Sequence, residues 1–243
     1  MRNYKEETEK RVGFIRTQLE ESGADGIVFG NSGGKDSVLV GILCKMACDN
    51  TVGLIMPCTS KCNYEDDMTD ALMISKIYRI EKRKVDLTKT ADALKKSLKD
   101  AADLTSGAEA NIAPRLRMAA LYAVAATENR LVAGTGNKSE RHMGYFTKWG
   151  DGAFDFNPIA DLTVTEIYQF LIYLDVPNRI VEKVPSAGLY EGQTDEGEMG
   201  VTYKAIDEYL QTGVCTPDDM KRITNYHKIS AHKRNPPKVY EEI

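Results

Sequence analysis

The sequence predicts an α/β fold in which a parallel sheet is covered by helices on both faces. Short apolar segments typical of strands alternate with longer segments whose apolar residues recur at helical spacing. In addition, two glycine-rich turns, at 30–37 and 134–140, directly follow apolar strands. Such folds bind ligands at the carboxyl ends of their strands, so both turns are expected at the same edge of the sheet.

The first half of the chain supplies the sheet. An amphipathic helix at 3–22 ends at Gly23. The elements expected after it are a strand at 26–29, a helix at 38–43, a strand at 51–56 stopped by Pro57, a helix at 64–77, a strand at 79–85, a helix at 88–100, a helix at 111–128 and a strand at 130–134. Pro114 indicates that the helix at 111–128 begins at about Ala113, because proline is tolerated near a helix start and disruptive further in.

The second half is less regular. The segments 144–158 and 184–200 have little periodicity, which is typical of lids or binding loops, with disorder as the alternative. Helices are expected near 163–174, 196–210 and 216–230, before a basic tail at 232–238.

Composition limits the functional classes. The 243 residues, with a net charge of −4, favour one large domain without a nucleic-acid-binding surface. No stretch of eighteen apolar residues and no apolar leader is present, which predicts a cytoplasmic protein without a membrane partner. The five cysteines form no C-x-x-C pair, so they are expected to be free thiols.

The turn at 30–37, Gly-Asn-Ser-Gly-Gly-Lys-Asp-Ser, is suited to hold a phosphate chain. Its glycines let the backbone approach a ligand, its hydroxyls donate hydrogen bonds, and the next helix directs its positive end at the anion. It is not a Walker A loop, because Asp36 follows Gly34-Lys35 and Phe29 stands five residues before Gly34. The turn at 134–139 lacks the third glycine of a dinucleotide fingerprint. An ordinary βα turn remains the alternative for 30–37.

The loop resembles the PP-loop of the N-type ATP pyrophosphatases, and the whole chain resembles one member of that group, the ammonia-dependent NAD synthetases. The further motifs that carry this resemblance are Asn111-Ile112 with Arg115, Thr135 to Glu140, Gly144 to Lys148, Gly150 to Gly152, Asp155, Asn157-Pro158, Asp161-Leu162, Lys183 with Pro185 to Ala187, Gln193 to Glu196, His232 to Arg234 and Pro236-Pro237. These motifs run nearly end to end in the family's order and spacing.

The resemblance implies an adenine nucleotide alpha hydrolase-like, Rossmann-like fold and a ligase of NAD biosynthesis. Deamido-NAD, ATP and ammonia would give NAD, AMP and pyrophosphate. The nicotinate carboxylate has no good leaving group, so AMP would first be transferred to it, giving a mixed anhydride that ammonia attacks. Such an enzyme must hold two anions side by side and keep water from the adenylate.

The resemblance also implies the site. ATP would contact Gly30, Asn31, Ser32, Gly33, Gly34, Lys35, Asp36, Ser37, Thr135 and Ser186, and deamido-NAD would contact Arg115, Lys148, Asp155, His232 and Lys233. Asp36 and Glu140 would be catalytic and hold Mg²⁺ through carboxylate oxygens. Taken singly, either carboxylate also fits the first turn of a helix as a cap, and Lys35, Lys138, Arg115 and His232 fit a solvated surface.

Val164 departs from the family pattern, because relatives often carry an ATP-contacting lysine two residues after Asp-Leu. Lys35 is a candidate substitute, since this loop position is often uncharged in relatives. Free ammonia is the expected nitrogen donor, because the chain leaves no room for a glutaminase domain with its own nucleophile.

Relatives are homodimers with the substrate site at the subunit boundary, which implies the same arrangement here. The helix at 111–128 offers a broad face of small and apolar residues for a second subunit, formed by Ile112, Leu116, Ala119, Ala120, Ala123 and Val124. Burial of that face against the chain's own sheet is the alternative. Two other functions stay open, a PP-loop enzyme that modifies tRNA and a nucleotide sensor without chemistry.

Overall fold

The computed structural model describes residues 2–58, 64–183 and 194–240. Within these residues the sheet has four parallel strands in the order β3-β2-β1-β4. They are β1 (Gly26–Gly30), β2 (Thr51–Ile55), β3 (Glu81–Lys84) and β4 (Arg130–Ala133). Val28 of β1 lies opposite Val52 on one side and Val132 on the other. Apart from Thr51, the central strands β1 and β2 contain only apolar residues and glycine, because both faces of a parallel sheet are covered, as the sequence predicted.

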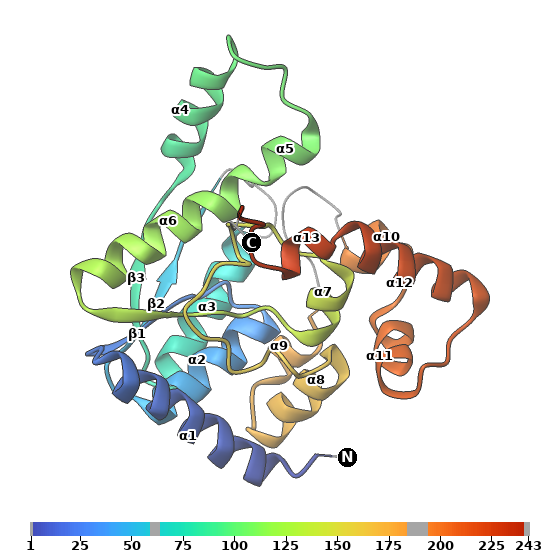
Figure 1. Ribbon diagram of the computed structural model, residues 1–243. Coiled ribbons are helices and arrows are strands. Elements are labelled where there is room, and N and C mark those ends of the chain that lie inside the picture. The colour runs from blue at the N-terminus through green and yellow to red at the C-terminus, as the bar shows by residue number, and fades with distance from the viewer. Residues whose placement is uncertain (1, 59–63, 184–193, 241–243) are drawn as a thin grey trace.

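One face of the sheet is covered by four helices (Figure 1): α1 (Tyr4–Ser22), α2 (Lys35–Ala47), α3 (Tyr64–Ile77) and α8 (Val164–Tyr173). Ile27 and Phe29 point from β1 into this layer, where they share a fully buried cluster with Ile15, Leu39 and Phe170. Asn3 begins α1 by accepting a hydrogen bond from the Glu6 backbone N–H, and Gly23 ends it in the left-handed conformation.

The other face is covered by α4 (Thr88–Leu98) and α6 (Ile112–Thr127), with the short α5 (Ser106–Ala110) between them. Val28, Val52 and Leu54 point into this second layer and pack with Ala125 of α6. Pro114 is tolerated because it is the third residue of α6, where a backbone N–H would have no partner within the helix. The helix begins one residue earlier than the sequence predicted.

A third cluster lies beside the sheet and forms the lobe at the right of Figure 1. Its helices are α7 (Lys138–Met143), α10 (Asp195–Met199), α11 (Tyr203–Thr212) and α12 (Pro217–Ile229), and the cluster contains the buried side chains of Met143, Val164, Met199, Tyr203 and Ile223. The remaining short helices are α9 (Asn178–Val181) and α13 (Ala231–Arg234). None of the described helices is long and apolar enough to cross a membrane.

The prediction of one continuous helix at 196–210 was wrong. The backbone at Gly200 has φ of +67°, which ends α10, and the Thr202 side chain then starts α11 by accepting a hydrogen bond from Ala205 N–H. A residue in the left-handed conformation ends one helix, and the N-cap residue that follows it begins the next helix. The short helices α5, α9 and α13 were not predicted.

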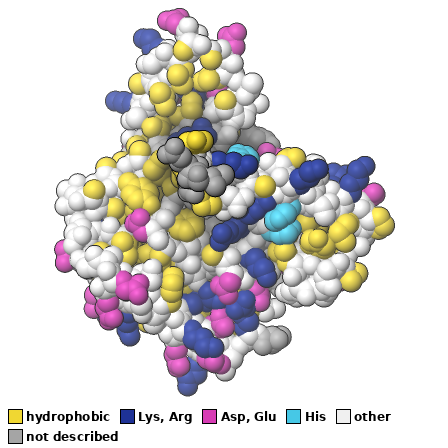
Figure 2. All heavy atoms as spheres, viewed as in Figure 1, with side chains coloured by type: hydrophobic (Ala, Val, Ile, Leu, Met, Phe, Trp, Pro, Cys, Tyr) yellow, Lys and Arg dark blue, Asp and Glu magenta, His cyan; other side chains and the backbone are white. Residues whose placement is uncertain are grey.

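The expected apolar face of α6 divides into two parts. Ile112, Leu116, Ala120 and Val124 pack in the cluster against the sheet, whereas Ala119 and Ala123 are exposed. Figure 2 shows hydrophobic side chains over the part of the surface that α4 and α6 form. The alternative of burial against the chain's own sheet therefore holds for the larger part of that face, and a narrower stripe of small residues stays exposed.

Candidate active site

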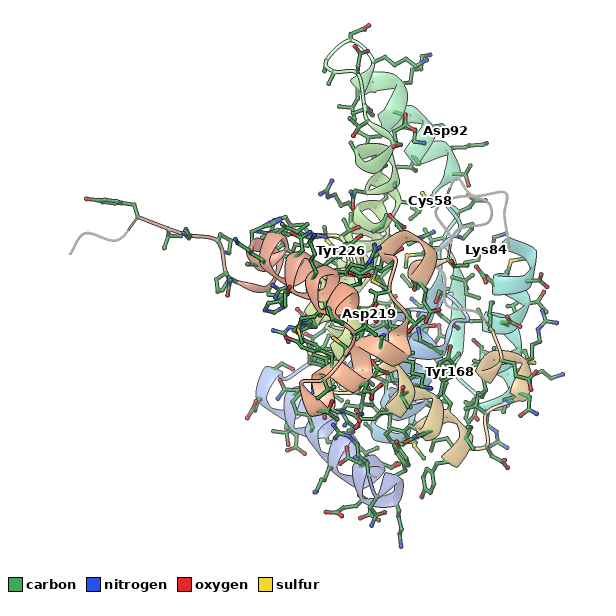
Figure 3. All side chains as sticks on the ribbon, turned by 90° about the vertical axis from the view of Figure 1, so that its right-hand side faces the viewer. Cys58, Lys84, Asp92, Tyr168, Asp219 and Tyr226 are labelled. Atoms are coloured by element: carbon green, nitrogen blue, oxygen red, sulfur yellow. The ribbon has the colours of Figure 1, made fainter. Side chains whose placement is uncertain are left out.

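A cavity of about 960 Å³ opens at the carboxyl ends of β1, β2 and β4. Both glycine-rich turns line it, because parallel strands bring the turns that follow them to one edge of the sheet. The remaining wall comes from α6, the segment after α7 and the C-terminal helices. Figure 3 labels two residues of this wall, Cys58 after β2 and Tyr226 of α12.

Hydrogen bonds of its own serine hydroxyls fix the shape of the turn after β1. The Ser32 and Ser37 Oγ atoms lie 3.0 Å apart, the Gly34 N–H donates to Ser32 Oγ at 3.3 Å, and Ser37 Oγ donates to the Gly34 carbonyl at 3.0 Å. Helix α2 begins directly after this turn, at Lys35. Hydroxyls and a helix N-terminus at the same opening form an anion site suited to phosphate oxygens.

Asn31, which the resemblance implied in ATP binding, lines the cavity and also connects the turn to α3. Its side chain is buried, and Nδ2 donates to the Ala71 carbonyl at 3.3 Å and to Ser75 Oγ at 3.1 Å in α3. Its Oδ1 accepts from the Gly33 N–H at 3.3 Å. The side chain of Asn31 thus fixes the turn to α3.

The two turns meet through Asn137, which is fully buried. Its Nδ2 donates to Asp36 Oδ1 at 3.1 Å, and its Oδ1 accepts from the Glu140 N–H at 2.9 Å. Glu140 Oε2 accepts in turn from the Asn137 N–H at 3.1 Å, which completes a capping box at the start of α7. Burial and the nearby Asp36 raise the pKa of Glu140 well above its usual value. The structure therefore brings the two expected carboxylates together.

This pair of carboxylates fits a magnesium ion. Magnesium prefers oxygen ligands and is usually bound by one or two carboxylates, with phosphates and water completing its shell. Across the described part of the chain, no group of three or more His, Cys, Asp or Glu residues could hold a metal. Asp36 and Glu140 would supply two oxygen ligands to such an ion, beside the turn at 30–37.

Lysine and arginine side chains surround this centre. Lys35 is buried, and its Nζ lies 2.7 Å from Asp36 Oδ2. Lys183 Nζ donates to Asp67 Oδ1 and Asp70 Oδ2, both at 2.6 Å, on the α3 side of the cavity. Arg117 of α6 lines the cavity and donates through Nε to the Met56 carbonyl at 3.0 Å. Burial lowers the pKa of the Arg117 guanidinium. These cations suit a substrate of high negative charge.

Among the other residues expected at the site, Thr135, His232 and Lys233 line the cavity, whereas Arg115, Lys148 and Asp155 do not. Arg115 is exposed on α6. Asp155 accepts from Tyr122 Oη at 3.1 Å and from the Val132 N–H at 2.7 Å. Ser186 and the first part of the expected lid at 184–200 lie outside the described residues.

Three hydrogen bonds join helix α13 to the irregular segment at 144–158. Lys148 Nζ donates to the His232 carbonyl at 2.8 Å, and Lys233 Nζ donates to the Gly144 and Phe146 carbonyls, both at 2.7 Å. These lysines therefore hold the segment and α13 together, as well as adding positive charge near the cavity. Val164 is buried in the third cluster, away from the solvent.

Two residues that the structure places at the site, Asn137 and Arg117, were not identified from the sequence. Asn137 was part of a matched motif but was given no role, and its contact with Asp36 spans 101 positions of sequence. Arg117 was not singled out, although a signal was present. It lies at the spacing of buried or half-buried positions on α6, four residues after Ala113 and four before Leu121. A cation on the inner face of a helix indicates a charged partner or ligand.

Comparison with known proteins finds relatives over nearly the whole chain. The NAD synthase family matches residues 7–237. An NH(3)-dependent NAD(+) synthetase of Carboxydothermus hydrogenoformans is 48% identical over 240 residues, which covers 98% of each chain.

Solved structures give the same fold. An NMN synthetase of Francisella tularensis superimposes with a TM-score of 0.94 at 36% identity, over 100% of both chains. An NH3-dependent NAD synthetase of Campylobacter jejuni superimposes with a TM-score of 0.81 at 32% identity, over 99% of this chain and 100% of that one.

Proposed function

The chain belongs to the NAD synthase family, and we propose that the cavity at the ends of β1 and β4 is where it performs the family's reaction. That reaction is the ATP-dependent amidation of deamido-NAD to NAD with ammonia. One observation supports this placement above the others. Asp36 and Glu140, from two turns far apart in the sequence, are joined through Asn137 beside a hydroxyl-rich phosphate turn.

The first step transfers AMP to the nicotinate carboxylate. A carboxylate oxygen attacks the α-phosphorus of ATP, the bond from that phosphorus to the α–β bridging oxygen breaks, and pyrophosphate leaves. In this proposal the Ser32 and Ser37 hydroxyls and the start of α2 bind the departing pyrophosphate. Arg117 approaches the nucleotide from the opposite wall.

The second step forms the amide. Ammonia attacks the carbonyl carbon of the mixed anhydride, the bond from that carbon to the AMP oxygen breaks, and a proton is lost from nitrogen. Water would hydrolyse the same anhydride, so the site must exclude it. The contacts of Lys148 and Lys233 hold the segment at 144–158 over the cavity, and this segment is the proposed barrier.

Asp36 and Glu140 are the proposed ligands of Mg²⁺ because both are oxygen donors beside the phosphate turn. When bound, the ion would screen the negative charge that develops on the phosphates. The chain's own part is to hold the two carboxylates in position, through the Asn137 side chain and the capping box of α7.

The reaction is tested by measuring AMP and NAD after mixing the protein with ATP, deamido-NAD, Mg²⁺ and an ammonium salt. We expect AMP and NAD in equal amounts. Without deamido-NAD there is no carboxylate on which the adenylate can form, and without ammonium the adenylate stays bound and shielded from water, so neither product is expected in either case. AMP release that requires tRNA would instead identify an RNA-modifying enzyme. Nucleotide binding without any AMP release would identify a sensor.

A second candidate substrate is the mononucleotide that lacks the adenylyl half of deamido-NAD. The F. tularensis structure, which superimposes with a TM-score of 0.94, is an NMN synthetase. The reacting carboxylate is the same in both substrates, so the chemistry of the cavity does not separate them. Comparing kcat/KM for deamido-NAD and nicotinate mononucleotide in the same assay decides between the two substrates, and we expect deamido-NAD to be preferred.

A homodimer with substrate at the subunit boundary is also proposed. Arg115, Ala119, Ala123 and Ala126 form an exposed stripe on α6, and Asp155 lies beside the same helix through Tyr122. Residues implied in deamido-NAD binding thus lie outside the protomer's own cavity, on a surface that a second copy could cover.

Sedimentation is expected to give twice the chain mass. Ala119→Arg is expected to shift the protein to monomer, because a long charged side chain prevents two helices from approaching closely, and to lower activity. Thr17→Arg, on exposed α1 across the sheet, is the matched control and should change neither property. An active wild-type monomer would refute the dimer.

The remaining proposals concern the chain as a whole. Use of free ammonia as the nitrogen donor is supported by the similarity to an NH(3)-dependent relative, with 98% of each chain covered. The cytoplasm is the proposed compartment, because ATP and a dinucleotide are the charged substrates that the reaction consumes.

A further inference from the structure

Lys35 is a buried cation inside the proposed metal site. Its side chain is only 7% exposed, its Nζ lies 2.7 Å from Asp36 Oδ2, and it faces the Tyr203 ring at 5.6 Å from the centroid. The other oxygen of Asp36 accepts from Asn137 Nδ2 at 3.1 Å. Each oxygen of this carboxylate therefore has a donor from the chain itself.

An ammonium group and a divalent cation compete for the same oxygen. A metal that binds Asp36 Oδ2 has to displace the Lys35 ammonium, and two cations at contact distance repel each other in a partly desolvated site. Because Lys35 is buried against Tyr203 and the carboxylates, its Nζ cannot simply turn into bulk water. It needs another anion within reach.

The triphosphate of ATP is that anion. Lys35 stands at the end of the phosphate turn, next to Ser32 and Ser37, whose hydroxyls face the same cavity. On the far wall the Lys183 ammonium is already paired with Asp67 and Asp70. Lys35 is therefore the cation that an arriving phosphate chain meets at the turn itself.

We propose that, in the nucleotide-free protein, the Lys35 ammonium pairs with the oxygen of Asp36 that would ligate the metal. A divalent ion therefore binds tightly only when the triphosphate of ATP pairs with the ammonium in place of Asp36. This inference rests on the proposed ligation by Asp36 and Glu140. It makes Lys35 a positioning residue that couples metal entry to ATP entry, and it weakens the binding of an ion without substrate.

The test measures Mn²⁺ binding by electron paramagnetic resonance, with Mn²⁺ as an oxygen-ligated probe for Mg²⁺. Wild type, Lys35→Met and Lys45→Met are titrated with and without α,β-methylene-ATP, which cannot be cleaved between the α and β phosphates. Lys45 is the matched control, a lysine of the same helix whose Nζ pairs with Asp49.

Without nucleotide, Lys35→Met should bind Mn²⁺ about tenfold or more tightly than wild type and Lys45→Met, because removing an ammonium removes a competing charge. With the analogue, the difference should fall to about threefold or less, since the phosphates hold the ammonium away from Asp36.

Equal or weaker Mn²⁺ binding by Lys35→Met without nucleotide overturns the inference. Asp36→Asn separates this failure from failure of the proposed function. If Asp36→Asn loses Mn²⁺ in the presence of the analogue while Lys35→Met behaves as wild type, the ligand assignment stands and the role of Lys35 is wrong. If wild type with the analogue binds no Mn²⁺, the ligand assignment itself is wrong. Should Lys35→Met melt below wild type, Lys35→Gln, which keeps a polar end without the charge, is read by the same criteria.

Discussion

Alanine in place of Asp36 or Glu140 is expected to lower the rate of AMP formation by about a thousandfold, which corresponds to roughly 4 kcal/mol of transition-state stabilisation. The reason is that each carboxylate supplies one of the two proposed protein ligands of Mg²⁺. Without the ion, the charge that develops on the leaving pyrophosphate is no longer screened. The measurement is the AMP release assay at saturating ATP and deamido-NAD.

Glu140 also caps a helix, so its substitution needs a control that loses the same cap. Glu166 provides it, because Glu166 Oε2 accepts from the Thr163 N–H in an equivalent capping box at the start of α8. Glu140→Ala and Glu166→Ala should both lower the free energy of unfolding, by about 1 kcal/mol for the lost cap. Only Glu140→Ala should lose activity to the full extent. Equal activity losses in the two variants would show that Glu140 acts through the stability of its helix and would remove the magnesium assignment.

Glu140→Gln refines the same test. Its amide oxygen can still accept from the Asn137 N–H, so the cap is kept while the negative charge is lost. Wild-type stability with activity near that of Glu140→Ala is the expected result. Activity near wild type would contradict the proposed role of the charge.

The sequence predicted the edge of the sheet at which the site lies, because parallel strands place the turns that follow them together. The hydrogen bond from Asn137 to Asp36 is the direct expression of that rule. The pairing of Asp36 with Glu140 came instead from the resemblance to the family. Their assignment did not require knowing any side-chain orientation.

The orientation of the side chains could not be predicted from the sequence. Asn31 belongs to the phosphate turn, yet its amide binds Ala71 and Ser75 of α3, forty or more positions along the chain. No local pattern encodes such a contact, because it depends on how α3 packs on the sheet. The break of the helix at 196–210 is different, since Gly200 followed by Thr202 carried a stop and a cap signal that apolar periodicity obscured.

Gly33→Ala is expected to be the most damaging single-methyl change in the phosphate turn. Gly33 has φ of +75°, and a Cβ there would lie 2.5 Å from the Asp67 carbonyl and 2.9 Å from the Ala71 N. The left-handed conformation alone costs an alanine about 1 kcal/mol, and a clash with the backbone of α3 adds to it. A total near 3 kcal/mol corresponds to a fall in Tm of roughly 10 °C for a domain of this size. Because relief of the clash moves the turn, AMP formation should fall as well.

Gly23→Ala separates the two contributions. Gly23 has φ of +66°, close to that of Gly33, but nothing lies within 4 Å of its added Cβ. It should therefore show only the conformational cost, a fall in Tm of about 3 °C, with unchanged activity at a temperature where both variants are folded. If Gly33→Ala lowered Tm no more than Gly23→Ala, the turn would have moved from α3 without cost. The close packing of the turn on α3, which fixes where the phosphates sit, would then not be needed for the fold.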